Sequence, residues 1–501
     1  MNFNSLEFLI FLPVVLAVFW LLPHKFRWAW LLAASYYFYM SWNAWLIFLI
    51  LGTTLCSYGA AIAIDRTKNV KIKKLLLALT IIVCLGTLVF FKYFNFLLKS
   101  AIDFLNLFSM NIQSVSLDII LPVGISFYTF QTLSYVIDVY RGKFAPEYHF
   151  GYYALFVSYF PQLVAGPIER PDKLLPQLRK EQFISSDDFA AGLRILLTGF
   201  FRKCVVADVC GLYVNSVFAD IGAANSLAVA IAGALFLVQI YCDFAGYSEI
   251  ATGAARMMGV RLTTNFDRPF LSVSVTEFFR RWHITLSKWF ADYLYIPLGG
   301  SRKGKARKIL NNFIVFGLCG LWHGANWTYF FWGIAMAVFI SAENLFGKPL
   351  KEFLKRRGAD IESPPIRLAR QMLLFVALVP TALLFRSASL AEYGRLFIKL
   401  FSDFGFGADY FTAAFSALDM SPVGAAELLC ALVCMAMVYN FGEFGKDGRE
   451  ELFPLSEQTA YSRGIFAQRY SVYVYIVLAI GACWLYLLSL GGVSEFTYFQ
   501  F

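Results

Sequence analysis

The segment 277-EFFRRWHITLSK-288, followed by 321-LWHGANW-327, decides how the rest of this sequence is interpreted. Only 4 histidines occur in 501 residues, and two of them, His283 and His323, lie here, each directly after a tryptophan. Because histidine can take and return a proton near neutral pH, a pair of them in apolar surroundings is a candidate catalytic pair. The alternative is that each is a packing residue at the end of a membrane helix, although an ionisable group at membrane depth favours a functional role.

The surrounding chain is strongly apolar, with 59% hydrophobic, 18% aromatic and only 15% charged residues. This composition is far too apolar for an ordinary soluble domain. It predicts an all-α polytopic integral membrane protein with about 11–13 transmembrane or re-entrant helices, the last of them at 471–490. The net charge of +10 comes from short loops between apolar runs. Membrane orientation and anionic lipid headgroups explain these loops better than nucleic acid, which is not expected as a partner.

The order of charges predicts the orientation of the first helix. Glu7 precedes the first apolar run, and the basic residues Lys25 and Arg27 follow it. This pattern is unlike a secretory signal, so the segment is expected to stay in the mature protein. The positive-inside rule then places the N-terminus outside and residues 23–27 in the cytoplasm.

Polar residues within apolar runs are further candidates for function. Gln131 belongs to a stripe of hydroxyl and amide side chains that could join helices or line a polar tunnel. Asp243 lies near the end of the long apolar run 226–246, where a carboxylate is usually paired. Residues 160–171 contain three prolines, so helix cannot continue through them and a re-entrant segment or an ordinary turn is expected.

The residues on either side of each histidine predict the structural element on which it lies. The basic residues at 302–308 and at 348–370 are both expected in the cytoplasm. Residues 309–346 must therefore enter the membrane from the cytoplasmic side and return to that side. The outgoing arm, 309–323, would span about 22 Å, less than the roughly 30 Å of a hydrocarbon core, which predicts a helix break at His323 inside the membrane layer. His283 is expected on a single amphipathic segment over 272–288.

At these residues the chain resembles the membrane-bound O-acyltransferase family over almost its whole length. The segments that carry the resemblance are 160–171, 241–251, 280–287, 295–300, 321–327 and the Phe-Gln-Phe ending. The resemblance implies one transmembrane domain over 1–501, with N-terminal helices at 1–150, a catalytic core at 151–346 and C-terminal helices at 347–501. These helices would surround a central polar funnel or tunnel.

The resemblance also implies roles and partners. His323 would be the catalytic histidine and His283 its partner. The acyl donor would be a cytoplasmic thioester such as acetyl-CoA or an acyl-carrier thioester. The acyl group would pass to an extracytoplasmic polysaccharide such as alginate, or to an extracytoplasmic acetyltransferase partner, from a multi-pass protein of the bacterial inner membrane surrounded by its lipids.

The chemistry of such a transfer suggests roles for the neighbouring residues. A hydroxyl is a poor nucleophile at neutral pH, so His323 is predicted to act as general base. Asn326, Trp322 or His283 could donate hydrogen bonds to the oxyanion, and the residues expected to give further support are Trp282, Ser287, Gln131 and Asp243. No metal or tightly bound cofactor is expected. Two alternatives stay open, namely D-alanyl transfer to teichoic acid from a carrier-protein thioester and a non-enzymatic transporter or channel.

Overall fold

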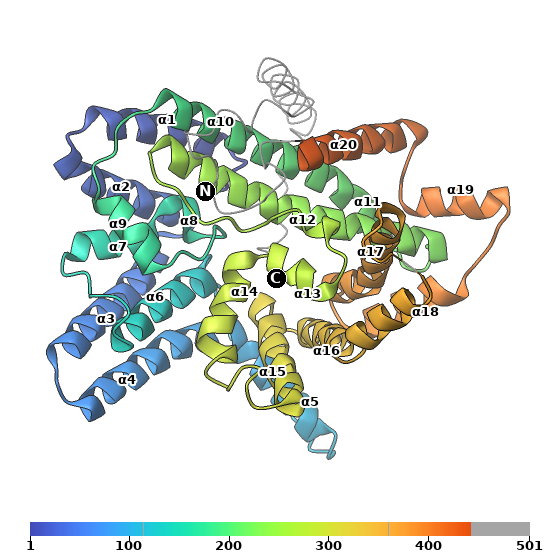
Figure 1. The fold of residues 1–501 in the computed structure, drawn as a ribbon, viewed down its shortest axis with the longest axis horizontal. Coiled ribbons are helices and arrows are strands. Elements are labelled where there is room, and N and C mark those ends of the chain that lie inside the picture. Colours follow the sequence, from blue (N-terminus) through green and yellow to red (C-terminus); the bar gives the residue numbers. More distant parts are fainter. Residues whose placement is uncertain (114, 359, 442–501) are drawn as a thin grey trace. The chain divides into compact units, whose positions relative to one another are not determined.

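A computed structural model describes residues 1–113, 115–358 and 360–441, and in these ranges the chain forms helices and no β-strand (Figure 1). The first half contains α1 (Leu6–Leu21), α2 (His24–Met40), α3 (Ile47–Arg66), α4 (Val70–Leu88), α5 (Phe94–Asn106), α6 (Ile125–Tyr140), α7 (Phe150–Ser158), α8 (Phe160–Leu163), α9 (Pro171–Arg179), α10 (Ser186–Phe200) and α11 (Asp208–Ala219). The second half contains α12 (Ser226–Met257), α13 (Val275–Arg281), α14 (Ile284–Phe290), α15 (Lys305–His323), α16 (Trp327–Arg356), α17 (Pro364–Arg386), α18 (Leu390–Ser402), α19 (Ala408–Ala417) and α20 (Pro422–Phe441). The predicted helix 471–490 lies outside the described residues.

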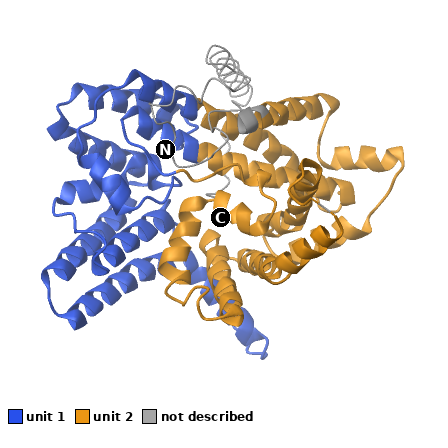
Figure 2. Cartoon of the chain, viewed as in Figure 1, with its two compact units in different colours: residues 1–196, 248–263 blue, residues 197–247, 264–501 orange. Residues whose placement is uncertain are grey.

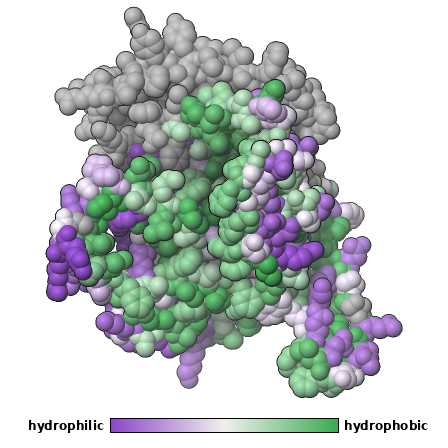
Figure 3. Space-filling view, turned by 90° about the vertical axis from the view of Figure 1, so that its right-hand side faces the viewer, coloured by the Kyte–Doolittle hydropathy of each residue, from purple (hydrophilic) through white to green (hydrophobic). Residues whose placement is uncertain are grey.

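Several helices are long and apolar enough to cross a membrane. Among the described residues there are 5, namely Ala44–Arg66, Val70–Asn106, α12, α16 and α17, or up to 6 if the bent pair α19 and α20 forms one span. Many large hydrophobic side chains on these helices are exposed, as expected for surfaces that face lipid. Figure 3 shows hydrophobic residues over much of one face of the molecule. The class of all-α polytopic membrane protein is therefore confirmed.

Several of the other segments counted in the prediction of about 11–13 transmembrane or re-entrant helices form helices with fewer than the roughly 20 residues needed to span a membrane. An example is α1, whose 16 residues would span about 24 Å at 1.5 Å per residue. The number of these shorter helices that enter the membrane stays a prediction.

The chain divides into two compact units (Figure 2). Unit 1 comprises Met1–Leu196 with Ser248–Thr263, and unit 2 comprises Leu197–Tyr247 with Thr264–Phe501. In unit 1, α3 packs against α4, α6 and α7. In unit 2, α15 packs along α16, and α16 packs against α13 and α17. These boundaries differ from the predicted sections 1–150, 151–346 and 347–501, and the single functional domain stays a prediction.

Helix boundaries near the two histidines differ from those predicted. α15 begins at Lys305 rather than 309, because the basic residues of the preceding loop continue the helix, and its 19 residues span about 28 Å. The helix is therefore longer than predicted, but the added residues include Lys305, Arg307 and Lys308, so the short apolar arm and the depth of His323 in the membrane stay predictions. The predicted helix end at His323 is confirmed.

The single amphipathic segment predicted over 272–288 was wrong. It is split into α13 and α14, and the backbone leaves helical geometry at Trp282 and His283. By contrast, the predicted interruption within 160–171 is confirmed, because α8 ends at Leu163 and α9 begins only at Pro171.

Glycines allow the close pairing of α15 and α16. A Cβ atom on Gly320 would overlap the carbonyl oxygen of Tyr329, and one on Gly333 would overlap the carbonyl oxygen of Phe316. The two helix backbones can therefore meet only where both residues lack side chains. This pairing fixes the end of α15, where His323 lies.

We expect Gly320→Ala to lower the stability of the protein by roughly 1–3 kcal/mol, because the added methyl group must push the hairpin apart. Thermal unfolding of the purified protein in detergent measures the change. Gly347→Ala on the same hairpin is the matched control, since the nearest atom to its added Cβ, Glu343 Cγ, is 3.8 Å away. Equal melting temperatures for Gly320→Ala and the wild type would contradict this account of the hairpin.

Candidate active site

His323 is the last residue of α15, and aromatic rings surround it. Its ring centroid lies 5.1 Å from that of Trp322, 5.4 Å from Trp332 and 5.3 Å from Phe385. These contacts come from α15, α16 and α17, and they leave the side chain buried. The hairpin and α17 together therefore hold this imidazole in a mainly apolar setting.

His283 lies between α13 and α14, in the left-handed backbone region with φ 42° and ψ 55°. This conformation costs a residue other than glycine about 1–2 kcal/mol, so tertiary contacts must maintain it. The ring is buried at 2% exposure and meets Phe244 of α12 edge-on, with 4.7 Å between centroids. The strain and the burial together hold this side chain at one position.

Trp322 connects the two histidines. Its ring centroid lies 5.8 Å from that of His283 and 5.1 Å from that of His323. Burial of the His283 ring, together with the electrostatic effect of His323 nearby, lowers the pKa of His283 well below its ordinary value of 6.5. His283 is therefore an uncharged imidazole at neutral pH.

A cavity of about 50 Å³ adjoins His323. Apart from His323 and Thr381, its lining is apolar, and it includes Phe244, Trp282, Trp332, Met336, Ala382 and Phe385. Ligand sites commonly combine such an apolar wall with a few polar groups. The predicted polar funnel or tunnel is not this cavity and stays a prediction.

The structure brings four of the predicted site residues together in unit 2, namely His283, His323, Trp282 and Trp322. The Oγ atom of Ser287 in α14 lies 3.5 Å from the carbonyl oxygen of Trp282, beside this group. Asn326 instead caps α16: its Oδ1 accepts from the N–H of Thr328 at 3.1 Å, and its Nδ2 donates to Ala388 O at 2.8 Å.

Asp243 and Gln131 have other partners. Asp243 forms an ion pair with Lys203, with 2.7 Å between Oδ1 and Nζ, and both side chains are buried. Gln131 belongs to unit 1, where its Nε2 donates to the carbonyl oxygen of Phe156 at 2.7 Å. Within the described residues, no group of three or more His, Cys, Asp or Glu side chains could hold a metal ion.

Asn265 is a residue of the site that the sequence did not suggest. Its Oδ1 lies 2.9 Å from Nδ1 of His283 and 2.9 Å from Oγ1 of Thr285. In the sequence it appears only as part of Asn265-Phe-Asp-Arg-Pro269, where the proline marks a helix stop. No local pattern identifies the partner of a histidine 18 residues away.

The fold and the site define a polytopic, all-helical membrane protein with two buried histidines near an apolar cavity. A model of the membrane-bound O-acyltransferase family matches residues 144–360, which include both histidines. The chain is 34% identical to the probable alginate O-acetylase of Pseudomonas putida over 509 residues, covering 100% of both chains. It is also 34% identical to that of Azotobacter vinelandii, again covering 100% of both chains. The peptidoglycan O-acetyltransferase of Helicobacter pylori is 33% identical over 350 residues, 65% of this chain and 66% of that one.

The chain belongs to the membrane-bound O-acyltransferase family. It is therefore an enzyme, an O-acyltransferase, and the alternative of a non-enzymatic transporter or channel is not supported. The family resemblance found in the sequence is confirmed.

The lowered pKa of His283 predicts how stability depends on pH. Below about pH 6.5 the unfolded chain binds a proton at this residue and the folded protein does not, so stability falls as the pH drops and is unaffected above that value. We expect the melting temperature to fall more steeply between pH 7 and pH 5 for the wild type than for His283→Gln. The loss of one bound proton can change the free energy of unfolding by at most about 1.4 kcal/mol per pH unit.

Thermal unfolding in detergent across this pH range measures the difference. His24→Gln is the matched control and should follow the wild type, because His24 lies at the start of α2, outside the site. Parallel curves for the wild type and His283→Gln would contradict a buried, uncharged His283.

Proposed function

We propose that the protein transfers an acetyl group from a cytoplasmic thioester, acetyl-CoA, to hydroxyl groups of an extracytoplasmic polysaccharide such as alginate. The observation that carries the proposal is the position of His323, a buried imidazole in the wall of the cavity beside a second buried imidazole. The names of the relatives support O-acetylation and a polysaccharide acceptor.

His323 acts as general base in this proposal. The acceptor oxygen attacks the thioester carbonyl carbon while His323 takes the hydroxyl proton. The tetrahedral intermediate then collapses, the C–S bond breaks, and the imidazolium returns the proton to the thiolate sulfur. An ester and a free thiol leave, and the histidine is again neutral.

The oxyanion of the intermediate needs a hydrogen-bond donor. We assign this role to Trp322, because its ring lies against the rings of both histidines. The amide of Asn326 caps α16 and bonds to Ala388, which favours a structural role for it.

The size of the cavity supports acetyl as the transferred group. About 50 Å³ beside His323 suits a short acyl group, and bulky side chains such as Phe236, Trp332 and Phe385 form the wall. A long acyl chain would require these side chains to move.

The basic loops support the direction of transfer. The loop before α15 includes Arg302 and Lys303, and α15 itself begins at Lys305. The positive-inside rule places these basic residues in the cytoplasm of a bacterial inner membrane, with the N-terminus outside. α15 then leads from this basic loop to His323 at its other end. The proposal includes both routes for the acetyl group, directly to the sugar or first to an extracytoplasmic acetyltransferase partner.

We expect His323→Ala to reduce acetyl transfer by at least about 100-fold, because a general base typically contributes a factor of 10²–10⁴. The assay uses purified protein in nanodiscs, radiolabelled acetyl-CoA and alginate oligosaccharides, with and without secreted partner proteins. His24→Ala controls for loss of a histidine outside the site and should retain wild-type turnover. Wild-type turnover in a folded His323→Ala protein would refute the assignment of His323 as the base. Transfer of D-alanine from a carrier-protein thioester, in place of acetyl transfer, would refute acetyl-CoA as the donor.

We expect Met336→Ala to increase the ratio of butyryl to acetyl transfer about tenfold, because a few methylene groups in an apolar pocket change selectivity by about 10–200-fold. Met336 lines the cavity on α16 and is buried at 1% exposure. Competition between the two acyl-CoA donors measures the ratio. Met372→Ala is the control, since Met372 on α17 is 57% exposed, and an unchanged ratio in Met336→Ala would show that acyl groups bind elsewhere.

A further inference from the structure

Residues 264–274, the part of the connection between α12 and α13 that directly precedes α13, run beside the backbone that carries His283 and are named the strap. The N–H of Asp267 donates to the carbonyl oxygen of Arg281 at 2.9 Å, and the N–H of Ile284 donates to that of Asn265 at 2.9 Å. These two bonds lie on either side of His283. They accompany the departure of Trp282 and His283 from helical geometry and bring Asn265 next to the imidazole.

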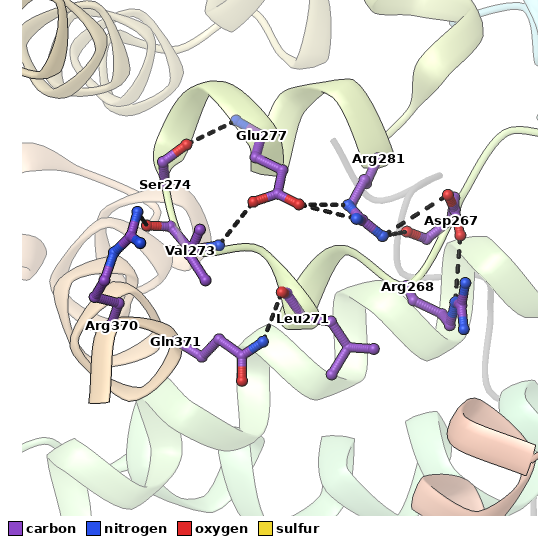
Figure 4. A network of polar contacts seen from close by, with 9 residues as sticks. All are labelled: Asp267, Arg268, Leu271, Val273, Ser274, Glu277, Arg281, Arg370 and Gln371. Carbon is purple, nitrogen blue, oxygen red and sulfur yellow. Dashed lines mark hydrogen bonds and ion pairs between the residues drawn. The ribbon is translucent and has the colours of Figure 1, made fainter. Parts of the chain in front are cut away.

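Charged side chains hold the strap in place (Figure 4). Arg281 pairs with Glu277 at 2.9 Å and with Asp267 at 3.8 Å. The other carboxylate oxygen of Glu277 accepts from the N–H of Val273 at 3.0 Å. From α17, Gln371 donates to the carbonyl oxygen of Leu271 at 2.7 Å. The strap is thus fixed on one side by α13 and on the other by α17.

The hydrogen bonds of Asn265 determine which nitrogen of His283 carries the proton. The N–H of Thr285 lies 3.4 Å from Oδ1 of Asn265 and can only donate, so the atom at this position is the amide oxygen. An oxygen accepts, and Nδ1 of His283 at 2.9 Å must therefore donate to it. In a neutral imidazole the proton is then on Nδ1, and Nε2 has the lone pair.

The chemical nature of this partner matters as much as its position. A carboxylate in place of the amide would stabilise the charged imidazolium, as an acidic residue does beside a catalytic histidine. An amide oxygen accepts the same hydrogen bond without a full negative charge. The ring of His283 therefore keeps a fixed orientation and remains neutral.

We propose that Asn265 is a positioning residue of the acyl transfer, which fixes His283 with its proton on Nδ1 and with Nε2 as an acceptor, so that positive charge develops on His323 alone. The inference rests on the proposed function of His323 as base. A neutral His283 beside Trp322 lets His323 take a proton, whereas a charged one would oppose it. In this tautomer Nε2 has no proton to donate, which excludes His283 as an oxyanion donor through that atom.

The charged groups near His283 are compatible with a neutral imidazole that carries its proton on Nδ1. Asp243, next to Phe244 on α12, is paired with Lys203, and Arg281 on α13 is paired with Glu277 and Asp267. His323 on α15 acts against protonation of His283. The other charged residues on these elements are Arg268 of the strap, Arg280 of α13, Lys288 of α14, Glu249 and Arg256 of α12, and Lys305, Arg307 and Lys308 of α15.

The test compares Asn265→Asp with Asn265→Leu. In Asn265→Asp the new carboxylate raises the pKa of His283, so the acid limb of the kcat/KM profile for acetyl transfer should move to higher pH by about one unit or more. In Asn265→Leu the imidazole of His283 loses its fixed orientation, so kcat should fall about 10-fold or more. The acid limb of the pH profile should not move to higher pH in this variant. KM for acetyl-CoA should stay within twofold in both, because Asn265 acts through His283.

Asn225→Leu is the matched control. Asn225 is buried in the same unit and also makes two side-chain hydrogen bonds, to Tyr410 O at 2.8 Å and from the N–H of Ala228 at 3.0 Å, away from the histidines. It should leave the shape of the pH profile unchanged. Wild-type pH profiles for both Asn265 variants would overturn the proposal. Higher activity of Asn265→Asp than of the wild type at low pH would also overturn it, because that result is expected if His283 donates a hydrogen bond to the oxyanion.

A second measurement needs no variant of Asn265. With only 4 histidines in the chain, ¹⁵N-histidine labelling of the wild type, assigned with His283→Gln, should show His283 protonated on Nδ1 and not on Nε2 near pH 7. The opposite tautomer would overturn the inference whether or not acetyl transfer is found. A wild type that transfers no acetyl but has the expected tautomer would instead refute the proposed function and leave the role of Asn265 in holding His283 intact.

Discussion

Burial of two imidazole rings among aromatic side chains is the constraint on which the site depends. A buried polar group left without a partner costs about 1–3 kcal/mol, so the fold must deliver hydrogen-bond partners to the rings. For Nδ1 of His283 that partner is Asn265. Asn265 reaches it only because the strap lies along residues 281–284, and the strap lies there because Arg281 and Gln371 hold it. One hydrogen bond thus requires the ion pairs of α13, the position of α17 and the left-handed backbone of His283.

The carboxylate of Asp243 shows how charge is kept apart from this site. Taking an ion out of water costs several kcal/mol unless a well-placed opposite charge compensates, and Lys203 lies 2.7 Å from it. Lys203 belongs to a π-helical turn, Phe201–Ala207, that precedes α11, so the pair joins this turn to α12. The next residue, Phe244, points about 100° further around the helix and contacts His283. One helix therefore presents a neutralised charge on one side and an apolar ring to the histidine on another.

The sequence predicted those features that depend on local composition and spacing. Apolar runs identified a polytopic helical membrane protein, the prolines of 160–171 predicted an interruption, and the two Trp-His pairs identified the residues that meet around Trp322. It failed where distant contacts override local preference. The periodicity of 272–288 favours one helix, but hydrogen bonds from a strap more than ten residues earlier in the chain break it at His283. Asn265 could not be found for the same reason, since its role depends on where the strap is held rather than on its neighbours in sequence.

The apolar wall of the cavity explains why a neutral second histidine would suit the base that we propose at His323. Charges are poorly solvated beside side chains such as Phe244, Trp332 and Phe385, so any charge formed there is costly unless its opposite forms nearby. The proton transfer that we propose to His323 would satisfy this condition, because the imidazolium and the oxyanion would appear together and attract each other. A permanent positive charge on His283 would disturb that balance before the reaction begins, whereas a neutral ring held by an amide does not. The choice of asparagine rather than aspartate at 265 therefore follows from the same low polarity that makes the cavity suitable for a small acyl group.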